Sequence, residues 1–179
     1  FVESQLRNCS YDVTLGSHFY TEKSTFKPLP DGLADQLPKV VDPFTAGAAD
    51  DLWERLEPVN GCIVLQPGQT VLGHTNEFIG TWGKITTKMQ ARSSIGRYNV
   101  SVCLCAGMGD IGYFNRWTLE IKNHSQRHPI ELRVGMRIAQ VIFEQCRSPP
   151  IAEYSGVYTL PKTESHRSYE ELEGLWKPQ

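Results

Sequence analysis

Short alternating stretches of apolar and polar residues fill most of the chain, and each stretch ends at a turn residue such as Gly, Pro or Asn. Residues 10–21 alternate in this way, with an interruption at Gly16, and residues 62–79 form two runs around the turn Gln66-Pro67-Gly68. The other predicted strands span residues 82–89, 100–106, 117–123 and 137–143. Turn signals that recur about every 8–12 residues favour an all-β sandwich or barrel over alternating β/α units.

Two parts of the chain lack this alternation. Residues 27–58 are polar and punctuated by proline, which predicts an insertion or an extended loop. Residues 149–179 are polar and irregular, as in a C-terminal arm or lid. A chain of 179 residues can form one domain with a sizeable core. We therefore expect one β domain at residues 1–148, with an insertion at about 27–58, and an arm at 149–179.

The net charge of −2 and the pI near 6.2 argue against a bulk nucleic-acid binder, because such proteins need an excess of Lys and Arg to displace counterions. Any phosphate must therefore be bound locally. No run of 18 apolar residues is present, so no membrane segment is expected. The chain starts at Phe1 rather than Met, and we expect the natural protein to begin upstream of it.

The cysteines are odd in number and lack the spacing of a secreted disulfide framework. We expect reduced thiols and a cytoplasmic protein. The residues are Cys9, Cys62, Cys103, Cys105 and Cys146.

The stretch "KMQARSSIGR" at residues 88–97 is too polar for a buried strand and too poor in helix formers for a helix. Arg92 and Arg97 offer forked donors that match phosphate oxygens, while Ser93 and Ser94 supply hydroxyl groups. Gly96 permits a turn that can aim backbone N–H groups at an anion. Taken alone, the stretch equally fits a polar loop that closes a hairpin.

A second group of polar residues lies in "GMGDIGYFNRWTLEIKN". Asp110 follows a glycine in a turn, and Glu120 lies on the polar face of the predicted strand 117–123, opposite Trp117, Leu119 and Ile121. By itself, Glu120 also fits an ordinary solvent-facing strand residue. A third segment, "GMRIAQVIFE", places the amide of Gln140 in an apolar strand, where it needs a hydrogen-bonding partner.

Five segments in this order resemble the dCTP deaminase branch of the trimeric dUTPase superfamily. "SYDVTLG" resembles the motif S-Y-D-x-x-L-G, and "VLQPGQTVLGHTNEFI" resembles V-L-x-P-G-x-x-x-L-G-x-T-x-E. "ARSSIGR" is similar to A/G-R-S-S-L-G/A-R, and "GDIGYFNRWTLEIKN" to I-D-P-G-F-x-G-x-x-T-L-E-x-x-N. "RVGMRIAQVIFE" is similar to P-G-M-R-I-G/A-Q-L-x-F. The resemblance covers most of the chain.

This resemblance implies a mainly β, distorted barrel or jelly-roll-like subunit of the dUTPase type, with a C-terminal arm. It implies a homotrimer with active sites between subunits, and Mg²⁺ that binds with the triphosphate. Asp110 would accept the deoxyribose 3′-hydroxyl, and Gln140 would reach a phosphate. The nucleotide-binding residues carried over are Arg92, Ser93, Ser94, Arg97, Asp110, Thr118, Leu119, Glu120, Gln140 and Tyr154.

The expected chemistry is hydrolytic deamination of dCTP to dUTP and ammonia, without zinc. Zinc-dependent nucleobase deaminases carry H-x-E and P-C-x-x-C segments, and this sequence contains neither. Attack of water on cytosine C4 then requires a general base, for which Glu120 is the candidate. By resemblance, Ser93 would hold the water and Arg97 would tune Glu120 and stabilise developing charge.

Several positions depart from the pattern of the family. Gly109 stands where Ile is usual, and Asn115 where Gly is usual. In the tail, Val157 replaces an expected phosphate-binding Lys, and Pro161 replaces a Gln. The Gly-rich C-terminal motif with which ordinary dUTPases close over the triphosphate is missing, so dUTP rather than dUMP is the expected product.

Three alternatives remain at this stage. A bifunctional enzyme would convert dCTP to dUMP, and a dUTPase would only cleave between the α- and β-phosphates. A catalytically silent relative would bind nucleotides as a regulator, which the altered tail favours and the joint presence of Arg92, Ser93, Arg97, Asp110 and Glu120 disfavours.

Overall fold

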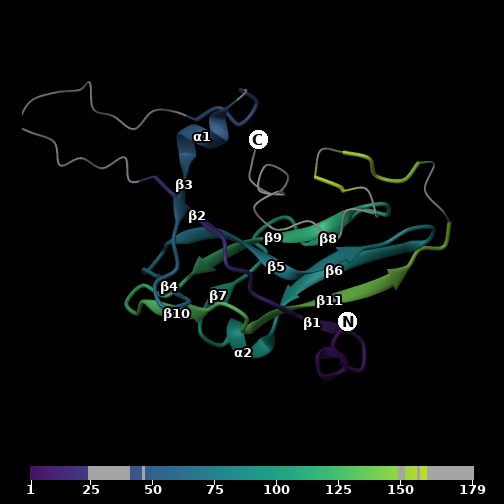
Figure 1. Cartoon of the computed structure of the whole chain (residues 1–179), viewed down its shortest axis with the longest axis horizontal. Coiled ribbons are helices and arrows are strands. Elements are labelled where there is room, and N and C mark those ends of the chain that lie inside the picture. The colour runs from purple at the N-terminus through teal and green to yellow at the C-terminus, as the bar shows by residue number, and fades with distance from the viewer. Residues whose placement is uncertain (24–40, 46, 149–151, 157, 161–179) are drawn as a thin grey trace, which may run out of the picture.

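The computed structural model describes residues 1–23, 41–45, 47–148, 152–156 and 158–160 (Figure 1). Within these ranges the chain is mainly β, which confirms the predicted class. The helical segments described are all short: η1 (Glu3–Gln5), α1 (Ala48–Leu52) and α2 (Ser93–Gly96).

Eleven strands form three antiparallel sheets. The first runs in the order β1 (Tyr11–Thr14), β11 (Arg137–Gln145), β6 (Ile85–Ala91) and β8 (Met108–Gly109). The second runs in the order β3 (Trp53–Leu56), β2 (Phe19–Glu22), β5 (Thr70–Gly80), β9 (Phe114–Asn123) and β7 (Val100–Ser101). The third pairs β10 (Ile130–Arg133) with β4 (Cys62–Leu65).

The hydrophobic core lies between the two larger sheets, since both contribute to one cluster of buried side chains. On β9 the predicted alternation is confirmed: Trp117, Leu119 and Ile121 are buried, while Thr118 and Glu120 are half-buried on the other face. The opposing sheet adds residues such as Val13, Met89, Ile138 and Val141 to the same cluster. Period-two patterning therefore fixed which face of each strand is apolar.

Two local predictions were wrong, and one strand was not predicted. The strand expected at 100–106 ends after Ser101, because the backbone turns there and the Cys105 N–H points at Glu120 instead of at a neighbouring strand. Strand β10 had no expected counterpart, since its four residues are too few to show a period. Residues 93–96, judged too poor in helix formers, make one helical turn in which the Gly96 N–H bonds to the Arg92 carbonyl.

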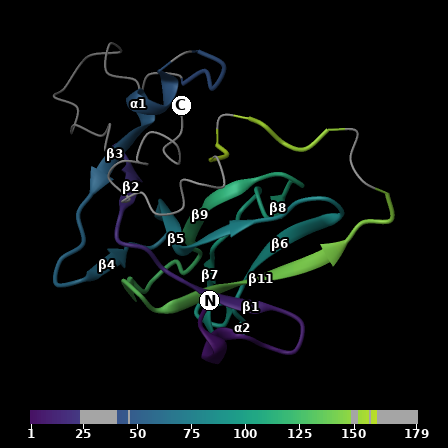
Figure 2. The same cartoon turned by 45° about the vertical axis from the view of Figure 1, so that its right-hand side comes forward.

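The range 27–58 also contains regular structure. Residues 24–40 and 46 lie outside the described residues, but α1 and β3 follow within the range that was expected to be a loop. Strand β3 pairs with β2, with Trp53 opposite Glu22 and Leu56 opposite Phe19. In both cartoons α1 and β3 lie on the opposite side of the molecule from α2 (Figures 1 and 2).

The five cysteines are all free thiols in the structure. Among the residues that the structure describes, no helix has both the length and the apolar character needed to cross a membrane.

His74 explains why the first segment is interrupted at Gly16. A Cβ atom at position 16 would lie only 1.8 Å from the His74 Cε1 atom, so only glycine fits against the buried ring. The Nδ1 atom of the ring lies 2.9 Å from the Thr75 carbonyl oxygen, and the Nε2 atom lies 3.2 Å from the His18 backbone nitrogen. This pattern suits a neutral ring that donates at Nδ1 and accepts at Nε2.

Acid is expected to destabilise the fold through His74. Burial lowers the pKa of His74 to about 3, so the folded state stays neutral while the unfolded state binds a proton below its pKa near 6.5. Unfolding thus takes up a proton between these values, and the free energy of unfolding should fall by about 1.4 kcal/mol per pH unit as the pH drops below ~6.5. Urea titrations at several pH values measure this slope.

A matched pair of variants tests the source of that slope. His74→Gln should flatten it, whereas the exposed His124→Gln should leave it unchanged. An unchanged slope in the His74 variant would assign the acid sensitivity to other groups.

Candidate active site

A cavity of about 350 Å³ lies between β8, β9 and the segment that follows β11. Four residues predicted to bind a nucleotide line it together: Asp110, Thr118, Glu120 and Tyr154. Asp110 comes from the turn before β9, and Thr118 and Glu120 come from β9. Tyr154 belongs to residues 152–156 and 158–160, which are drawn in yellow above β8 and β9 in Figure 1. The fold therefore gathers one subset of the predicted site in a single place.

Aromatic side chains form much of the wall of this cavity. The ring centroids of Tyr113 and Trp117 are 5.7 Å apart, and those of Tyr113 and Tyr154 are 6.3 Å apart. Tyr158 lines the same cavity. Burial, and then Tyr154, raise the pKa of Tyr113, so its hydroxyl stays protonated and donates to the Arg116 carbonyl at 2.9 Å. Such a cavity offers π-faces to a nucleobase.

Glu120 presents a fixed carboxylate to the cavity. Its Oε2 accepts a hydrogen bond of 2.8 Å from the Cys105 backbone N–H. Burial, and then the nearby Glu120 charge, raise the pKa of Cys103 to about 12, so that thiol stays neutral beside the carboxylate. A carboxylate held by one N–H and lining a cavity is suited to act as a general base.

The turn that carries Asp110 depends on Gly112. The Tyr113 N–H bonds to the Asp110 carbonyl at 3.1 Å, and Gly112 has a φ of 100°, which a side chain would strain. A Cβ atom at Gly112 would also lie 2.6 Å from the Tyr154 backbone nitrogen. The turn and the segment beyond β11 thus touch.

The glycine at position 109 has a packing explanation. A Cβ atom there would lie 2.2 Å from the Thr87 Oγ1 atom and 2.7 Å from the Trp117 ring. The large Trp117 side chain occupies the space that a larger residue at 109 would need. Glycine instead of the usual isoleucine at position 109 thus leaves room for Trp117 on β9.

Leu119 lies between Thr118 and Glu120 but faces the other way. Its side chain is fully buried in the core between the sheets. Only its backbone is left to approach a nucleotide on the polar face of β9.

Arg92 and Gln140 lie elsewhere, on the sheet that contains β1 and β11. The Arg92 Nε atom is 3.3 Å from Oδ1 of Asp12, whose side chain is 1% exposed. Asp12 also forms ion pairs with Arg7, at 2.7 Å, and with Arg137, at 3.7 Å. In the pairing of β1 with β11, Gln140 lies opposite Asp12. One carboxylate thus faces three guanidinium groups, which leaves a local excess of positive charge for an anion.

Ser93 and Ser94 lie on α2, Arg97 directly follows it, and all three are exposed. In both cartoons α2 lies on the far side of the subunit from residues 152–160, which border the cavity (Figures 1 and 2). Neither Ser93 nor Arg97 lines the cavity that holds Glu120.

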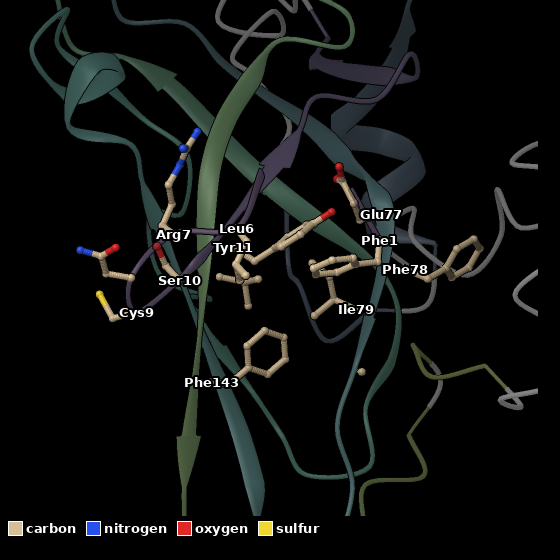
Figure 3. A pocket seen from close by; sticks show the side chains of 13 residues that line it. Phe1, Leu6, Arg7, Cys9, Ser10, Tyr11, Glu77, Phe78, Ile79 and Phe143 are labelled. Carbon is tan, nitrogen blue, oxygen red and sulfur yellow. The ribbon is translucent and has the colours of Figure 1, made fainter. Parts of the chain in front are cut away.

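A second cavity, of about 520 Å³, offers less suitable chemistry. Figure 3 shows that Tyr11, Ile79 and Phe143 gather around it. Its carboxylate, on Glu77, already accepts hydrogen bonds from the Gln5 amide and from the Thr14 N–H and hydroxyl. The lining of this larger cavity is mostly apolar, although it includes Arg7, Asn8 and Ser10, and its one acidic group is occupied within the fold.

Sequence reasoning missed part of the cavity lining. Tyr113 and Trp117 stand inside a recognised segment, where their aromatic character was a usable signal. Tyr158 had none, because its place depends on how the tail docks. Val157 and Pro161, the other tail positions singled out, lie outside the described residues. Within the described part of the chain, no three His, Cys, Asp or Glu residues group as metal ligands would.

Comparisons with known proteins support the family resemblance. The dCTP deaminase-like family profile matches residues 1–146. A Methanopyrus kandleri protein named "dCTP deaminase, dUMP-forming" is 33% identical over 162 residues, which cover 88% of this chain and 77% of that protein. A Halorubrum lacusprofundi protein named "dCTP deaminase" is 31% identical over 154 residues, covering 86% and 70%.

Among solved structures, the 2′-deoxycytidine 5′-triphosphate deaminase of Agrobacterium tumefaciens has a similar fold, with a TM-score of 0.58 and 20% sequence identity. The match covers 80% of this chain and 40% of that chain, so it concerns only part of the larger protein. This likeness confirms the predicted fold type.

Proposed function

Because this chain belongs to the dCTP deaminase-like family, we propose that it catalyses the hydrolytic deamination of dCTP. The observation that carries the proposal is the cavity in which Asp110, Thr118, Glu120 and Tyr154 meet. A carboxylate, a second polar group from the same strand and aromatic walls are what a cytosine nucleoside needs in order to be bound and attacked.

In this proposal the cytosine lies between the aromatic side chains, with C4 toward Glu120. Glu120 removes a proton from a water molecule as the water oxygen bonds to C4. The electron pair of the C4=N3 bond moves to N3, which takes the proton from Glu120. The carboxylate then transfers the proton of the new hydroxyl group to the amino nitrogen, the bond from C4 to that nitrogen breaks, ammonia leaves and the C4 carbonyl of uracil forms. Asp110, in its exposed turn, would accept a hydrogen bond from the 3′-hydroxyl of the deoxyribose.

The phosphate end of dCTP is assigned to the arginine-rich side of a subunit. Arg92, with Asp12 orienting its Nε, keeps further N–H groups for phosphate oxygens, and Gln140 lies in the same register. Asp12 does not suit a cation, because three guanidinium groups already face it. Magnesium would therefore bind mainly through the triphosphate oxygens and water, where it neutralises charge.

We further propose a homotrimer in which two subunits complete each site. Glu120 and Arg97 act together in the proposed mechanism, yet Arg97 does not line the cavity that holds Glu120 and instead borders a different cavity. A neighbouring copy would bring its own α2 to the cavity, so that the partner subunit's Ser93 holds the water and the partner subunit's Arg97 stabilises charge. Light scattering should then give three times the chain mass of 20.2 kDa.

Mixing two inactive variants tests the shared site. Glu120→Gln and Arg97→Ala should each be nearly inactive alone. If the two residues come from different subunits, reassembly of an equal mixture should restore about a quarter of wild-type sites in a closed ring. Deamination assays after mild unfolding and joint refolding measure this. Activity no higher than the sum of the separate variants would place both residues in one subunit or outside the mechanism.

The product of the reaction distinguishes a deaminase that forms dUTP from a bifunctional enzyme that forms dUMP. The tail departures predict dUTP, whereas the name of the M. kandleri relative, "dCTP deaminase, dUMP-forming", favours further cleavage to dUMP. Incubation with dCTP and Mg²⁺, followed by ion-exchange separation, distinguishes them. Accumulating dUTP supports deamination alone, and dUMP with pyrophosphate supports the bifunctional reaction. Well-folded protein that forms neither would refute the proposed activity and favour a silent nucleotide binder.

A further inference from the structure

Residues 152–156 and 158–160 are bound to the body of the chain by several hydrogen bonds. The Tyr154 N–H donates to the Ile111 carbonyl at 2.7 Å, and the Gly83 N–H donates to the Glu153 carboxylate at 2.9 Å. At the far end, the Leu160 N–H donates to the Phe114 carbonyl at 2.8 Å. The Leu160 side chain is 4% exposed, so this end of the segment is also buried.

Asn115 makes the contact at the centre of this docking. It is 2% exposed and occupies an inward position of β9, where an amide group is costly unless it is hydrogen-bonded. Its Nδ2 donates to the Tyr158 carbonyl at 3.0 Å, and its Oδ1 accepts the Arg116 N–H at 2.8 Å. The glycine usual at this position in the family has no side chain to make either bond.

Thr159 adds a second bond beside it. Its Oγ1 accepts the Phe114 N–H at 2.9 Å and lies 3.3 Å from the Gly112 carbonyl oxygen. The start of β9 is thus bound to the segment through both its backbone and the Asn115 side chain. These contacts involve protein groups alone, so they need no nucleotide.

Docking in this way decides the shape of the cavity. Tyr154 and Tyr158, which bracket the contact, both line the space that also holds Asp110 and Glu120. We propose that Asn115 is a positioning residue that keeps residues 152–160 docked in the nucleotide-free protein. Tyr154 and Tyr158 then form a standing wall of the cavity, not a lid that the nucleotide must order. This proposal rests on the assignment of the cavity to dCTP.

A preformed wall has a kinetic consequence. Ordering a segment on binding weakens affinity, so a segment that is already docked lowers the KM for dCTP. Once the nucleotide is bound, the chemistry at Glu120 is the same whether the wall was docked beforehand or not. Releasing the segment should therefore act on KM much more than on kcat.

Asn115→Asp is the most direct test in the full chain. It keeps an oxygen for the Arg116 N–H but replaces the donor to Tyr158 by a second oxygen. We expect hydrogen exchange of the backbone amides in 152–160, measured by mass spectrometry without nucleotide, to accelerate about tenfold. The KM for dCTP should rise by about the same factor, with kcat within about twofold of wild type.

Two further variants guard against general destabilisation. Thr159→Val removes the hydroxyl group from the segment itself, leaves the β sheets untouched, and should shift exchange and KM in the same direction. Asn123→Asp makes the same change at the other end of β9, where the amide donates to the Leu65 and His128 carbonyls. That control should leave the exchange of 152–160 unchanged.

The outcomes separate the inference from the proposed function. Unchanged exchange of 152–160 in both Asn115→Asp and Thr159→Val would overturn the anchoring role. Faster exchange with an unchanged KM would overturn the role of the wall in binding. A wild-type protein that does not convert dCTP would instead refute the proposed function, while the exchange data would still decide the anchoring.

Discussion

Replacing Glu120 by Gln should reduce the rate of dCTP deamination by about 10²–10⁴-fold, because general-base catalysis contributes about that much. The amide keeps the shape of the carboxylate, and its oxygen can still accept the Cys105 N–H bond of 2.8 Å. It cannot take a proton from water. Binding of dCTP should therefore change little, and the loss should appear in kcat. Steady-state kinetics together with calorimetric titration of dCTP separate the two effects.

Glu144→Gln is the matched control. Glu144 is also a half-exposed strand residue, but it lies on β11 and pairs with Lys88 at 3.0 Å, away from the cavity. Its variant should keep wild-type kcat. Near-wild-type turnover by Glu120→Gln would remove Glu120 from the mechanism.

Truncation after Pro150 should have the next largest effect, a loss of at least about 10–100-fold in kcat/KM for dCTP. It removes Tyr154 and Tyr158 from the cavity wall, and aromatic stacking on a base contributes about 1–3 kcal/mol. Both larger sheets remain, so the shortened chain should fold. Circular dichroism and thermal melting check the fold, and steady-state kinetics measure the loss, which should fall mainly on KM.

A second truncation, which retains more of the chain, tests the contribution of the docked segment. A chain that ends at Pro161 keeps every described contact of residues 152–160 with β9. It should bind dCTP better than the chain that ends at Pro150. Equal losses in the two truncations would show that the residues beyond 161, and not the wall of the cavity, provide the binding.

Much of the fold could be predicted because strand patterning is local. On β9 the alternation of Trp117, Leu119 and Ile121 with polar neighbours placed Glu120 on the open face. Strand boundaries were less predictable: the predicted strand at 82–89 begins at Ile85, and Trp82 is 63% exposed outside it. Such ends depend on where pairing stops, which involves contacts between residues distant in sequence.

The candidate site could be predicted only as a set of residues, since their grouping is a long-range property. The motif "ARSSIGR" indicated an anion site but not that none of its residues lines the cavity that holds Glu120. Leu119, expected among the nucleotide-binding residues, has its side chain in the core because neighbouring strand residues face opposite ways. Asp12 was noticed only as part of a motif, although it faces three arginines.

By itself, the sequence determined the β class and the apolar face of the strands, and it supplied the set of candidate residues for the proposed nucleotide chemistry. These properties follow from local periodicity and from the chemistry of single side chains. Only the tertiary structure decided that Glu120, Asp110 and Tyr154 share one cavity, that α2 lies away from it, and that Asn115 holds the tail. Those relations arise from packing between segments far apart in the chain, which no local pattern encodes.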